Sequence, residues 1–182
     1  MAMRGLTVFF TGLSGAGKTT VATTVRDLLR EEHGVPVSYL DGDEVRTFLS
    51  SELGFSKEHR DLNVLRIAWV AREVTRHGGV AVCAPIAPYR ETRRKARAMI
   101  EPLGRFVEVH VSTPLEVCEA RDPKGLYAEA RAGRIERFTG ISDPYEAPEQ
   151  PELRIDTSEG SAQDAARSIL AWLRDEDALP GR

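Results

Sequence analysis

The chain has 182 residues, of which 41% are hydrophobic and 29% are charged, and its formal net charge is −3. This composition suits one globular domain and excludes wholesale disorder or a fibrous repeat, and a mildly acidic chain is a poor candidate for nucleic-acid binding. No apolar run approaches the roughly 20 residues of a membrane-spanning helix, so no membrane partner is expected.

The first residues of the chain lack the layout of a signal peptide. We therefore expect a cytoplasmic protein, and cysteines in that compartment stay reduced. The chain has two cysteines, Cys83 and Cys118. We expect each of them to be a small, buried, apolar residue.

Short apolar runs alternate with helical patterns along the chain. Strands are predicted at residues 6–10, 37–40, 80–86, 106–111 and 152–157. Helices are predicted at residues 18–33, 44–49, 56–77 and 90–100, and from residues 113 and 161 onward. Gly34 is expected to end the first helix, and Ser56 and Ser161 to cap two others. This alternation predicts a three-layer α/β fold, a parallel five-stranded sheet with helices on both faces.

The helix that begins at Thr113 is predicted to have Pro114 at its first position and a capping box completed by Glu116. After this helix, residues 121–151 are rich in Gly, Pro and charge, with little apolar periodicity. A stretch this long is usually functional or disordered, and we interpret it as a lid. Residues 175–182 are expected to fray. No linker divides the chain, so residues 1–182 are predicted to be one domain.

Residues 12–19 have the sequence GLSGAGKT and match the phosphate-loop motif G-x-x-x-x-G-K-[ST] at every fixed position. A predicted strand precedes the motif and a predicted helix follows it, as the motif requires. The glycines let backbone N–H groups turn towards phosphate oxygens, Lys18 can reach the β- and γ-phosphates, and the Thr19 hydroxyl can bind Mg²⁺. A glycine-rich turn that matches by chance is the alternative, and the flanking elements weigh against it.

Two related motifs fail at single positions. The nucleophile elbow of α/β hydrolases would need glycine where Ala16 stands, and a dinucleotide-binding fingerprint would need glycine where Thr20 stands. No N-K-x-D guanine motif is present either. The sequence therefore predicts a nucleoside triphosphate site in a small P-loop kinase. Such an enzyme also needs an acid near the γ-phosphate, a second substrate pocket and a closing lid.

Two acidic residues, Asp41 and Asp43, follow the second predicted strand. Ligands of open α/β sheets bind beyond the carboxyl ends of the strands. Two carboxylates there could orient an acceptor hydroxyl, take its proton or hold Mg²⁺ through water. An Asp-Gly turn with Asp43 as a helix N-cap explains the same residues equally well.

The next part of the chain carries candidates for an anion site: Arg46, Arg60, Asn63 and Arg66. Arg60 and Asn63 share one face of the long predicted helix, and arginine can grip an oxyanion through two nitrogens. For any single one of these residues, a solvated helix surface is the simpler interpretation. The basic run at residues 90–97 is also interpreted mainly as a solvated face, with Arg90 and Arg93 as candidates for another role.

Two aromatic residues in predicted loops, Phe55 and Phe138, could hold a planar base between them. Arg121 and Lys124 open the irregular stretch and could close over nucleotide phosphates, as a lid does.

Taken together, these segments resemble one family closely, the adenylylsulfate (APS) kinases. The matching segments are residues 12–20, 40–46, 53–56, 59–63, 66–67, 118–127, 130–133, 138–141 and 144–146. The segments RDPKGLY at 121–127 and FTGI at 138–141 are far more specific than the phosphate motif. The resemblance implies transfer of the γ-phosphoryl group of ATP to the 3′-hydroxyl of APS with Mg²⁺, which gives 3′-phosphoadenylyl sulfate (PAPS) and ADP in sulfate assimilation.

The resemblance also implies roles for individual residues. ATP would be bound by Gly12, Ser14, Gly15, Ala16, Gly17, Lys18, Thr19, Thr20, Arg121 and Thr157. APS would be bound by Asp43, Arg46, Phe55, Arg60, Asn63, Ile86, Ala87, Lys124, Phe138 and Thr139. The two phenylalanines would stack on its adenine, and the arginines with Asn63 would hold its phosphosulfate. The catalytic set would be Lys18, Asp41 and Asp43, with Thr19 on the metal. Asp41 is the residue expected on the 3′-hydroxyl or the metal, and Asp43 is the alternative.

The resemblance further implies a homodimer and a functional link to ATP sulfurylase. The chain departs from the family at Ala87, where the family usually has a serine described as a phosphorylated intermediate. Because Ala87 has no hydroxyl, we expect direct transfer between the two substrates. Two alternatives are kept: a P-loop kinase with another acceptor, and a non-catalytic nucleotide-binding or regulatory module.

Overall fold

The computed structural model describes residues 5–179. Five parallel strands form one sheet in the order β2-β3-β1-β4-β5. The strands are β1 (Leu6–Thr11), β2 (Val37–Asp41), β3 (Val80–Ala84), β4 (Arg105–Val111) and β5 (Leu153–Ile155). Each neighbouring pair is parallel, and each crossover between strands contains at least one helix. The predicted fold class is confirmed.

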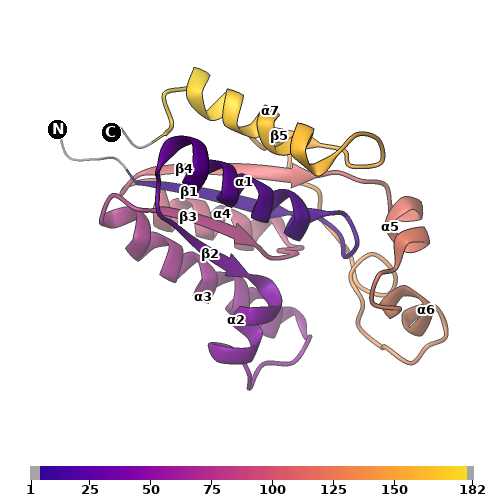
Figure 1. Ribbon diagram of the computed structural model, residues 1–182. Helices are drawn as coiled ribbons and strands as arrows, with labels where there is room; N and C mark the ends of the chain where they lie inside the picture. Colours follow the sequence, from indigo (N-terminus) through magenta and orange to yellow (C-terminus); the bar gives the residue numbers. More distant parts are fainter. Residues whose placement is uncertain (1–4, 180–182) are drawn as a thin grey trace.

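The helices in the described range are α1 (Lys18–His33), α2 (Gly42–Phe48), α3 (Lys57–Arg76), α4 (Arg90–Ile100), α5 (Leu115–Arg121), α6 (Leu126–Arg131) and α7 (Ala162–Asp175). Figure 1 shows α1 and α7 on one face of the sheet and α3 and α4 on the other, which gives the three predicted layers. Helices α5 and α6 lie beyond the end towards which β4 points. Among the described helices, none combines the length and hydropathy that crossing a membrane would need.

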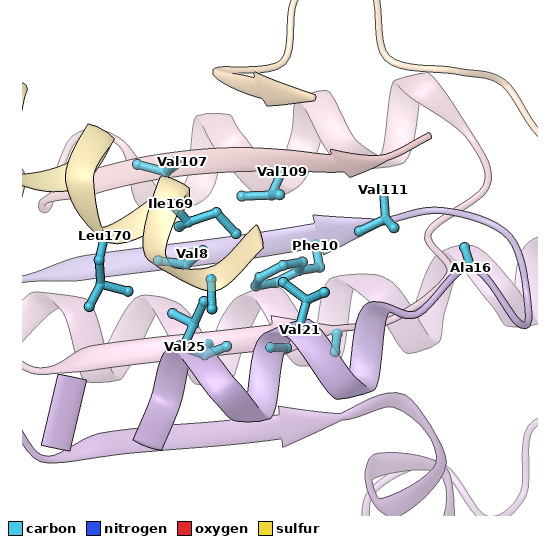
Figure 2. Packing of buried hydrophobic residues seen from close by; sticks show 14 of the residues in the cluster. Val8, Phe10, Ala16, Val21, Val25, Val107, Val109, Val111, Ile169 and Leu170 are labelled. Atoms are coloured by element: carbon cyan, nitrogen blue, oxygen red, sulfur yellow. The ribbon is translucent and has the colours of Figure 1, made fainter. Parts of the chain in front are cut away.

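The central strand β1 sends alternate side chains into two hydrophobic cores. Val8 and Phe10 pack with Val25 and Ile169 between the sheet and the layer of α1 and α7 (Figure 2). Phe9 belongs to the second core, under α3 and α4. All three β1 side chains are 0% exposed, and burying such a side chain contributes roughly 1.5–3 kcal/mol. The phosphate motif therefore starts from a firmly anchored strand.

The two cysteines are free and buried, as predicted. Cys83 lies on β3 and Cys118 on α5. Burial raises the pKa of both thiols. Each cysteine therefore serves as a small apolar residue of the core.

Two strands are shorter than predicted. β3 ends at Ala84 instead of residue 86, because Pro85 has no N–H to continue the ladder. The carbonyl of Ile86 instead accepts a hydrogen bond from Thr11 Oγ1 at 2.7 Å. β5 spans only residues 153–155, and the hydroxyl of Thr157 beyond it bonds to the phosphate loop.

Helix starts also differ from prediction at two places. α2 begins at Gly42, two residues early, because the Asp41 carboxylate caps it. The capping box predicted at Thr113 is wrong: α5 has Pro114 as its N-cap and no side-chain cap hydrogen bond. The Thr113 hydroxyl is used in a distant contact instead. The glycine end of α1 and the serine caps of α3 and α7 are confirmed.

The proposed lid at residues 121–151 is more regular than the sequence predicted, because it contains α6. The carboxylate of Asp122 organises this helix by accepting hydrogen bonds from the N–H groups of Tyr127 and Ala128, both at 3.0 Å. In the tail that was expected to fray, residues 175–177 are exposed, whereas Ala178 is only 2% exposed and Leu179 packs on the core. Residues 180–182 lie outside the described residues.

Candidate active site

The phosphate motif forms a tight loop between β1 and α1. Gly15 and Gly17 have φ values of 72° and 93°, which glycine adopts without steric cost. A Cβ atom on Gly15 would lie 2.9 Å from the carbonyl oxygen of Cys118, and one on Gly12 would lie 2.5 Å from that of Val111. The loop therefore packs too closely on β4 and α5 to accept larger residues at these positions.

The carbonyl groups of this loop are held by side chains from several parts of the chain. The donors are Lys18 to the carbonyl of Leu13, Tyr127 to Ser14, Arg121 to Gly15, and Thr113 and Thr157 to Ala16, at 2.7–3.4 Å. In contrast, within residues 5–179 the N–H groups of Ser14, Gly15 and Gly17 have no protein acceptor. Backbone N–H groups that point into a turn at a helix N-terminus bind anions, and phosphate oxygens are their usual ligands.

Lys18 is buried at the start of α1, with 7% of its surface exposed. Burial lowers its pKa to about 8, although the nearby charges of Asp43 and Asp41 oppose the shift. Its ammonium group donates to the carbonyl oxygen of Leu13 at 2.7 Å. The charge of this lysine is therefore sensitive to pH close to neutrality, and an anion in the loop would restore it.

The two aspartates beyond β2 have different surroundings. Asp41 Oδ2 accepts from the N–H groups of Asp43 and Glu44 at 3.0 and 3.2 Å, and Asp41 Oδ1 accepts from the Tyr39 hydroxyl at 3.3 Å. The helix cap is therefore Asp41, and the interpretation of Asp43 as the cap is wrong. The Asp43 side chain is 74% exposed and forms an ion pair with Lys124 from the lid.

Donors suited to a metal ion lie close to the phosphate loop. Asp41 Oδ1 accepts from the Tyr39 hydroxyl, and Thr19, whose side chain is exposed at the first turn of α1, is one of the groups that influence the pKa of that hydroxyl. Within the described part of the chain, no group of three or more His, Cys, Asp or Glu side chains could hold a metal ion alone. Protein Mg²⁺ sites at phosphates commonly use one or two carboxylates, phosphate oxygens and water. The donor set therefore fits Mg²⁺ that arrives with a nucleotide.

Arg60 on α3 joins two segments that are far apart in the sequence. Its Nε donates to the carbonyl of Phe55 at 2.9 Å, its Nη1 to Thr139 Oγ1 at 2.7 Å and its Nη2 to the carbonyl of Arg137 at 2.7 Å. Nη2 also lies 3.5 Å from a carboxylate oxygen of Asp143. The residue is 7% exposed. Arg60 thus links the loop before α3 to the lid, and its nitrogens already have protein acceptors.

The two aromatic residues predicted to hold a base have unlike environments. Phe55 is 57% exposed, and the guanidinium carbon of Arg46 lies 4.5 Å from its ring centre. Phe138 is 9% exposed and packs edge-on against Tyr127, with ring centres 4.9 Å apart. Arg60 connects their two segments. Phe55 is thus the open platform, while Phe138 is mostly covered.

Two further polar residues were expected to bind APS, Asn63 on α3 and Arg46 beside the Phe55 ring. Asn63 on α3 is 5% exposed, and its Oδ1 atom has no hydrogen-bond partner. Such a buried, unpaired acceptor usually marks a place for a ligand or water. Arg46 Nη1 donates to the carbonyl of Gly54 at 3.1 Å, and burial lowers its pKa, with the neighbouring charge of Arg60 adding to the effect.

The loop after β3 reaches the start of the phosphate loop. The Ile86 carbonyl accepts from the N–H group of Gly12 at 3.3 Å and from Thr11 Oγ1 at 2.7 Å. Ala87 has φ 46°, is 1% exposed and belongs to the core under α3 and α4. The Ile86 side chain is half-buried beside the phosphate loop, and the Ala87 side chain is covered.

Arg121 and Thr157, both expected to bind ATP, are in contact: Arg121 donates to both the hydroxyl and the carbonyl of Thr157. A turn of the lid also packs here: a Cβ on Gly140 would lie 2.9 Å from a methyl of Leu13. Thus the segments at residues 121–127 and 138–143 both contact the phosphate loop.

The sequence predictions missed three residues that shape the site: Tyr39, Thr113 and Tyr127. Thr113 was assigned to a helix cap. No local pattern distinguishes a threonine that caps a helix from one whose hydroxyl bonds to the distant carbonyl of Ala16. Tyr127 belongs to the specific segment at 121–127, which was the one signal that could have identified it.

Comparison with known proteins agrees with this geometry. The family model for adenylylsulphate kinase matches residues 4–156. An adenylyl-sulfate kinase of Synechococcus sp. (strain JA-3-3Ab) is 52% identical over 179 residues, which cover 98% of this chain and 99% of that protein. The APS kinase of Mycobacterium tuberculosis, solved in complex with AMPPNP and APS, is 43% identical with a TM-score of 0.89, and the match covers 94% of this chain and 98% of that one.

Longer proteins also match. A sulfate adenylyltransferase of Phaeosphaeria nodorum is 47% identical over 176 residues, which cover 97% of this chain but 31% of that protein. In that relative, the matching region is therefore one part of a larger polypeptide.

Proposed function

The chain belongs to the adenylylsulphate kinase family, and on that premise we propose how the residues described above bind two substrates. The protein is an ATP-dependent kinase that transfers the γ-phosphoryl group of ATP to the 3′-hydroxyl of APS, which gives PAPS and ADP. The observation that carries this conclusion is a match that spans the phosphate loop and the lid segments together.

In the proposed complex, the triphosphate of ATP occupies residues 12–19. The unpaired N–H groups of the loop, the N-terminus of α1 and the Lys18 ammonium supply positive charge. Thr19 and Thr20 are exposed at the first turn of α1, where they can contact the phosphates. The contact between Arg121 and Thr157 supports an adenine placed beside them.

We propose that APS occupies the space between α3 and the lid. Phe55 is exposed and flanked by Arg46, which supports a role as the platform for the APS adenine. The unpaired Asn63 Oδ1 supports a polar contact with the same ligand. Phe138 and Thr139 would border the base from the lid, held there by Arg60.

Arg60 has a different role in this proposal from the one implied by the resemblance alone. Because its nitrogens bond to Phe55, Thr139 and Arg137, we assign it first to holding the two walls of the APS pocket together. Arg46, of which one nitrogen contacts a backbone carbonyl, is the better candidate for gripping the phosphosulfate.

Asp41 and Asp43 divide the remaining tasks. Asp41 stands near Thr19, which supports a place for it on the Mg²⁺ side of the phosphates, through water. Asp43 faces Lys124 across the site and is free of the helix cap, which supports contact with the acceptor hydroxyl. When bound with ATP, Mg²⁺ would neutralise charge on the phosphate oxygens. Which aspartate takes the hydroxyl proton is decided by the experiment given in the Discussion.

The transfer is proposed to be direct. Phosphoryl transfer depends mainly on the placement of the two substrates and on charge neutralisation, so no covalent intermediate is needed. Ala87 is covered, so its side chain supplies neither a nucleophile nor a large contact surface. Ile86, half-buried at the start of the phosphate loop, would border APS from the β3 side.

Three further features are proposed on the family resemblance. The protein would act in the cytoplasm, would form a homodimer and would work in sequence with an ATP sulfurylase that supplies APS. The fusion of a matching region into a sulfate adenylyltransferase supports the last of these.

The test is ADP release by the purified protein with ATP, Mg²⁺ and APS, with adenosine 5′-phosphate as the control acceptor. Turnover with APS alone, abolished by Lys18→Ala, is the expected result. Turnover with the control acceptor and none with APS would point to a different acceptor. ATP binding without any turnover would point to a regulatory module.

A further inference from the structure

A buried arginine lies behind the site, where α4 packs against β4 and the end of the lid. Arg93 is 3% exposed, and its Nε lies 2.9 Å from Glu108 Oε1 on β4. It belongs to the basic run at residues 90–97, in which Arg90 and Arg93 were the candidates for a role other than a solvated face. Its neighbour on the helix, Arg94, fits that description, with a side chain 69% exposed.

The remaining nitrogens of Arg93 bind two other segments. Nη1 donates to the carbonyl of Ala87 at 2.6 Å, and Nη2 donates to the carbonyl of Glu146 at 2.5 Å. One guanidinium therefore connects three segments: β4, the loop after β3, and the part of the lid at residues 145–146, which we call the lid return. A lysine has a single nitrogen and could not make these contacts together.

A second bridge runs beside the first. The Tyr145 hydroxyl shares a hydrogen bond of 2.9 Å with Thr11 Oγ1, which also donates to the carbonyls of Ile86 and Ala87. The N–H group of Glu146 donates to the carbonyl of Pro88 at 2.8 Å. The lid return is thus fastened to the loop after β3 at adjacent residues.

This joint continues directly into the phosphate loop. Thr11 is the last residue of β1, and the next residue, Gly12, donates its N–H to Ile86. Ala87 holds a left-handed φ of 46°, which is unfavourable for a residue with a Cβ. Such conformations persist where the surroundings impose them, and they often occur at functional sites. Here the carbonyl of Ala87 is held by two donors, Thr11 Oγ1 and Arg93 Nη1.

We propose that Arg93 is a positioning residue of the phosphoryl transfer. By binding Ala87 and Glu146 at once, it sets the position of the loop after β3, and of the lid, relative to the phosphate loop. All three of its guanidinium nitrogens have protein acceptors, so it acts through these contacts. The inference rests on the proposed function, in which Ile86 borders APS and the phosphate loop holds ATP.

The test is the variant Arg93→Lys, which keeps the charge next to Glu108 but loses the bridge between the two carbonyls. We expect kcat to fall by about tenfold to a hundredfold, because small misplacements of reacting groups lower the rate by such factors. KM for ATP should stay unchanged. The matched control is Arg94→Gln, which breaks an exposed ion pair between the same helix and Glu149. This control is expected to keep the kcat of the unmodified protein.

Should Arg93→Lys fold poorly, the double variant Arg93→Gln with Glu108→Gln removes the buried pair without leaving an unpaired charge. It is expected to show the same loss of kcat per folded molecule. An unchanged kcat in either folded variant, or an equal loss in Arg94→Gln, would overturn the proposal.

Hydrogen exchange supplies a readout that does not depend on turnover. The N–H groups of Glu146 and Arg90 take part in the joint, through Pro88 and the Glu146 carboxylate. Both should exchange faster in Arg93→Lys and not in Arg94→Gln. Failure of the unmodified protein to phosphorylate APS would show that the proposed function is wrong. Independently of that result, unchanged exchange at Glu146 and Arg90 in Arg93→Lys would show that Arg93 does not hold the joint.

Discussion

The hydroxyl of Tyr127 donates to the backbone carbonyl of Ser14 at 2.8 Å, so helix α6 of the lid is bonded directly to the phosphate loop. The ring of Tyr127 also packs edge-on against the ring of Phe138, with 4.9 Å between the ring centres. One side chain therefore contacts both the proposed ATP loop and the proposed wall of the APS pocket.

Removing the Tyr127 hydroxyl should weaken ATP binding. For Tyr127→Phe we expect KM for ATP to rise by about fivefold, because one hydrogen bond contributes about 1 kcal/mol. Steady-state kinetics at saturating APS measure this change. Tyr89→Phe is the control, since no hydrogen bond of the Tyr89 hydroxyl is found among the described residues. Equal KM values in the two variants would contradict the prediction.

ATP binding should depend on pH near 8. Burial lowers the pKa of Lys18 to about 8, and the negative phosphates of ATP raise it again. Above this pH the free protein has lost the Lys18 charge, so ATP binding must take up a proton and affinity must fall as pH rises. Calorimetry in two buffers of different ionisation enthalpy measures the uptake. Uptake should vanish in Lys18→Ala, and its persistence there would assign the proton to another group.

Arg60→Lys should damage the APS pocket selectively. A lysine cannot reach Phe55, Thr139 and Arg137 together, and each lost bond from a charged donor costs about 1.5–3 kcal/mol. We expect a large rise in KM for APS with little change in KM for ATP. Arg76→Lys, at the far end of the same helix with an exposed contact to Glu73, is the control. A parallel rise in both KM values would show that the pocket is not the part affected.

Substitution of the two aspartates by asparagine separates their roles. Asparagine caps helices as well as aspartate, so Asp41→Asn should keep the α2 cap while it removes the charge and the second acceptor, which faces the Tyr39 hydroxyl. If Asp41 serves the Mg²⁺ side, its variant will need more Mg²⁺ for half-maximal rate. Asp43→Asn should instead lower kcat by about 10²-fold or more at any Mg²⁺ concentration, as loss of a general base does. The reverse pattern would exchange the two assignments.

A serine at position 87 should not create a phosphorylated intermediate. Ala87 is 1% exposed, so the hydroxyl of Ala87→Ser would be buried, and leaving it unpaired would cost about 1–3 kcal/mol of stability. We expect a lower melting temperature and an unchanged kcat per folded molecule. Intact-mass measurement after incubation with ATP should find no added phosphoryl group, and finding one would contradict direct transfer.

Local patterns along the chain were sufficient to predict the elements that form this fold. Alternating apolar runs, the glycine after α1 and the serines before α3 and α7 act over a few residues, and these predictions are confirmed. The phosphate motif is equally local, because strand, glycines, lysine and helix are contiguous. Predictions failed where a polar side chain bonds to a residue far away in the sequence. Thr113 bonds to Ala16, which is 97 residues away, instead of capping α5.

The sequence by itself determined the fold class, the position of the phosphate loop and the residue types around it, because hydrophobic periodicity and backbone freedom are properties of short segments. The tertiary structure alone decided what each polar side chain binds. Arg60 lies 79 residues from Thr139, and Arg93 lies 53 residues from Glu146. A guanidinium carries the same charge whether it faces water or joins two loops. Only the packing that buries it, and so requires an acceptor for each of its donors, distinguishes the two.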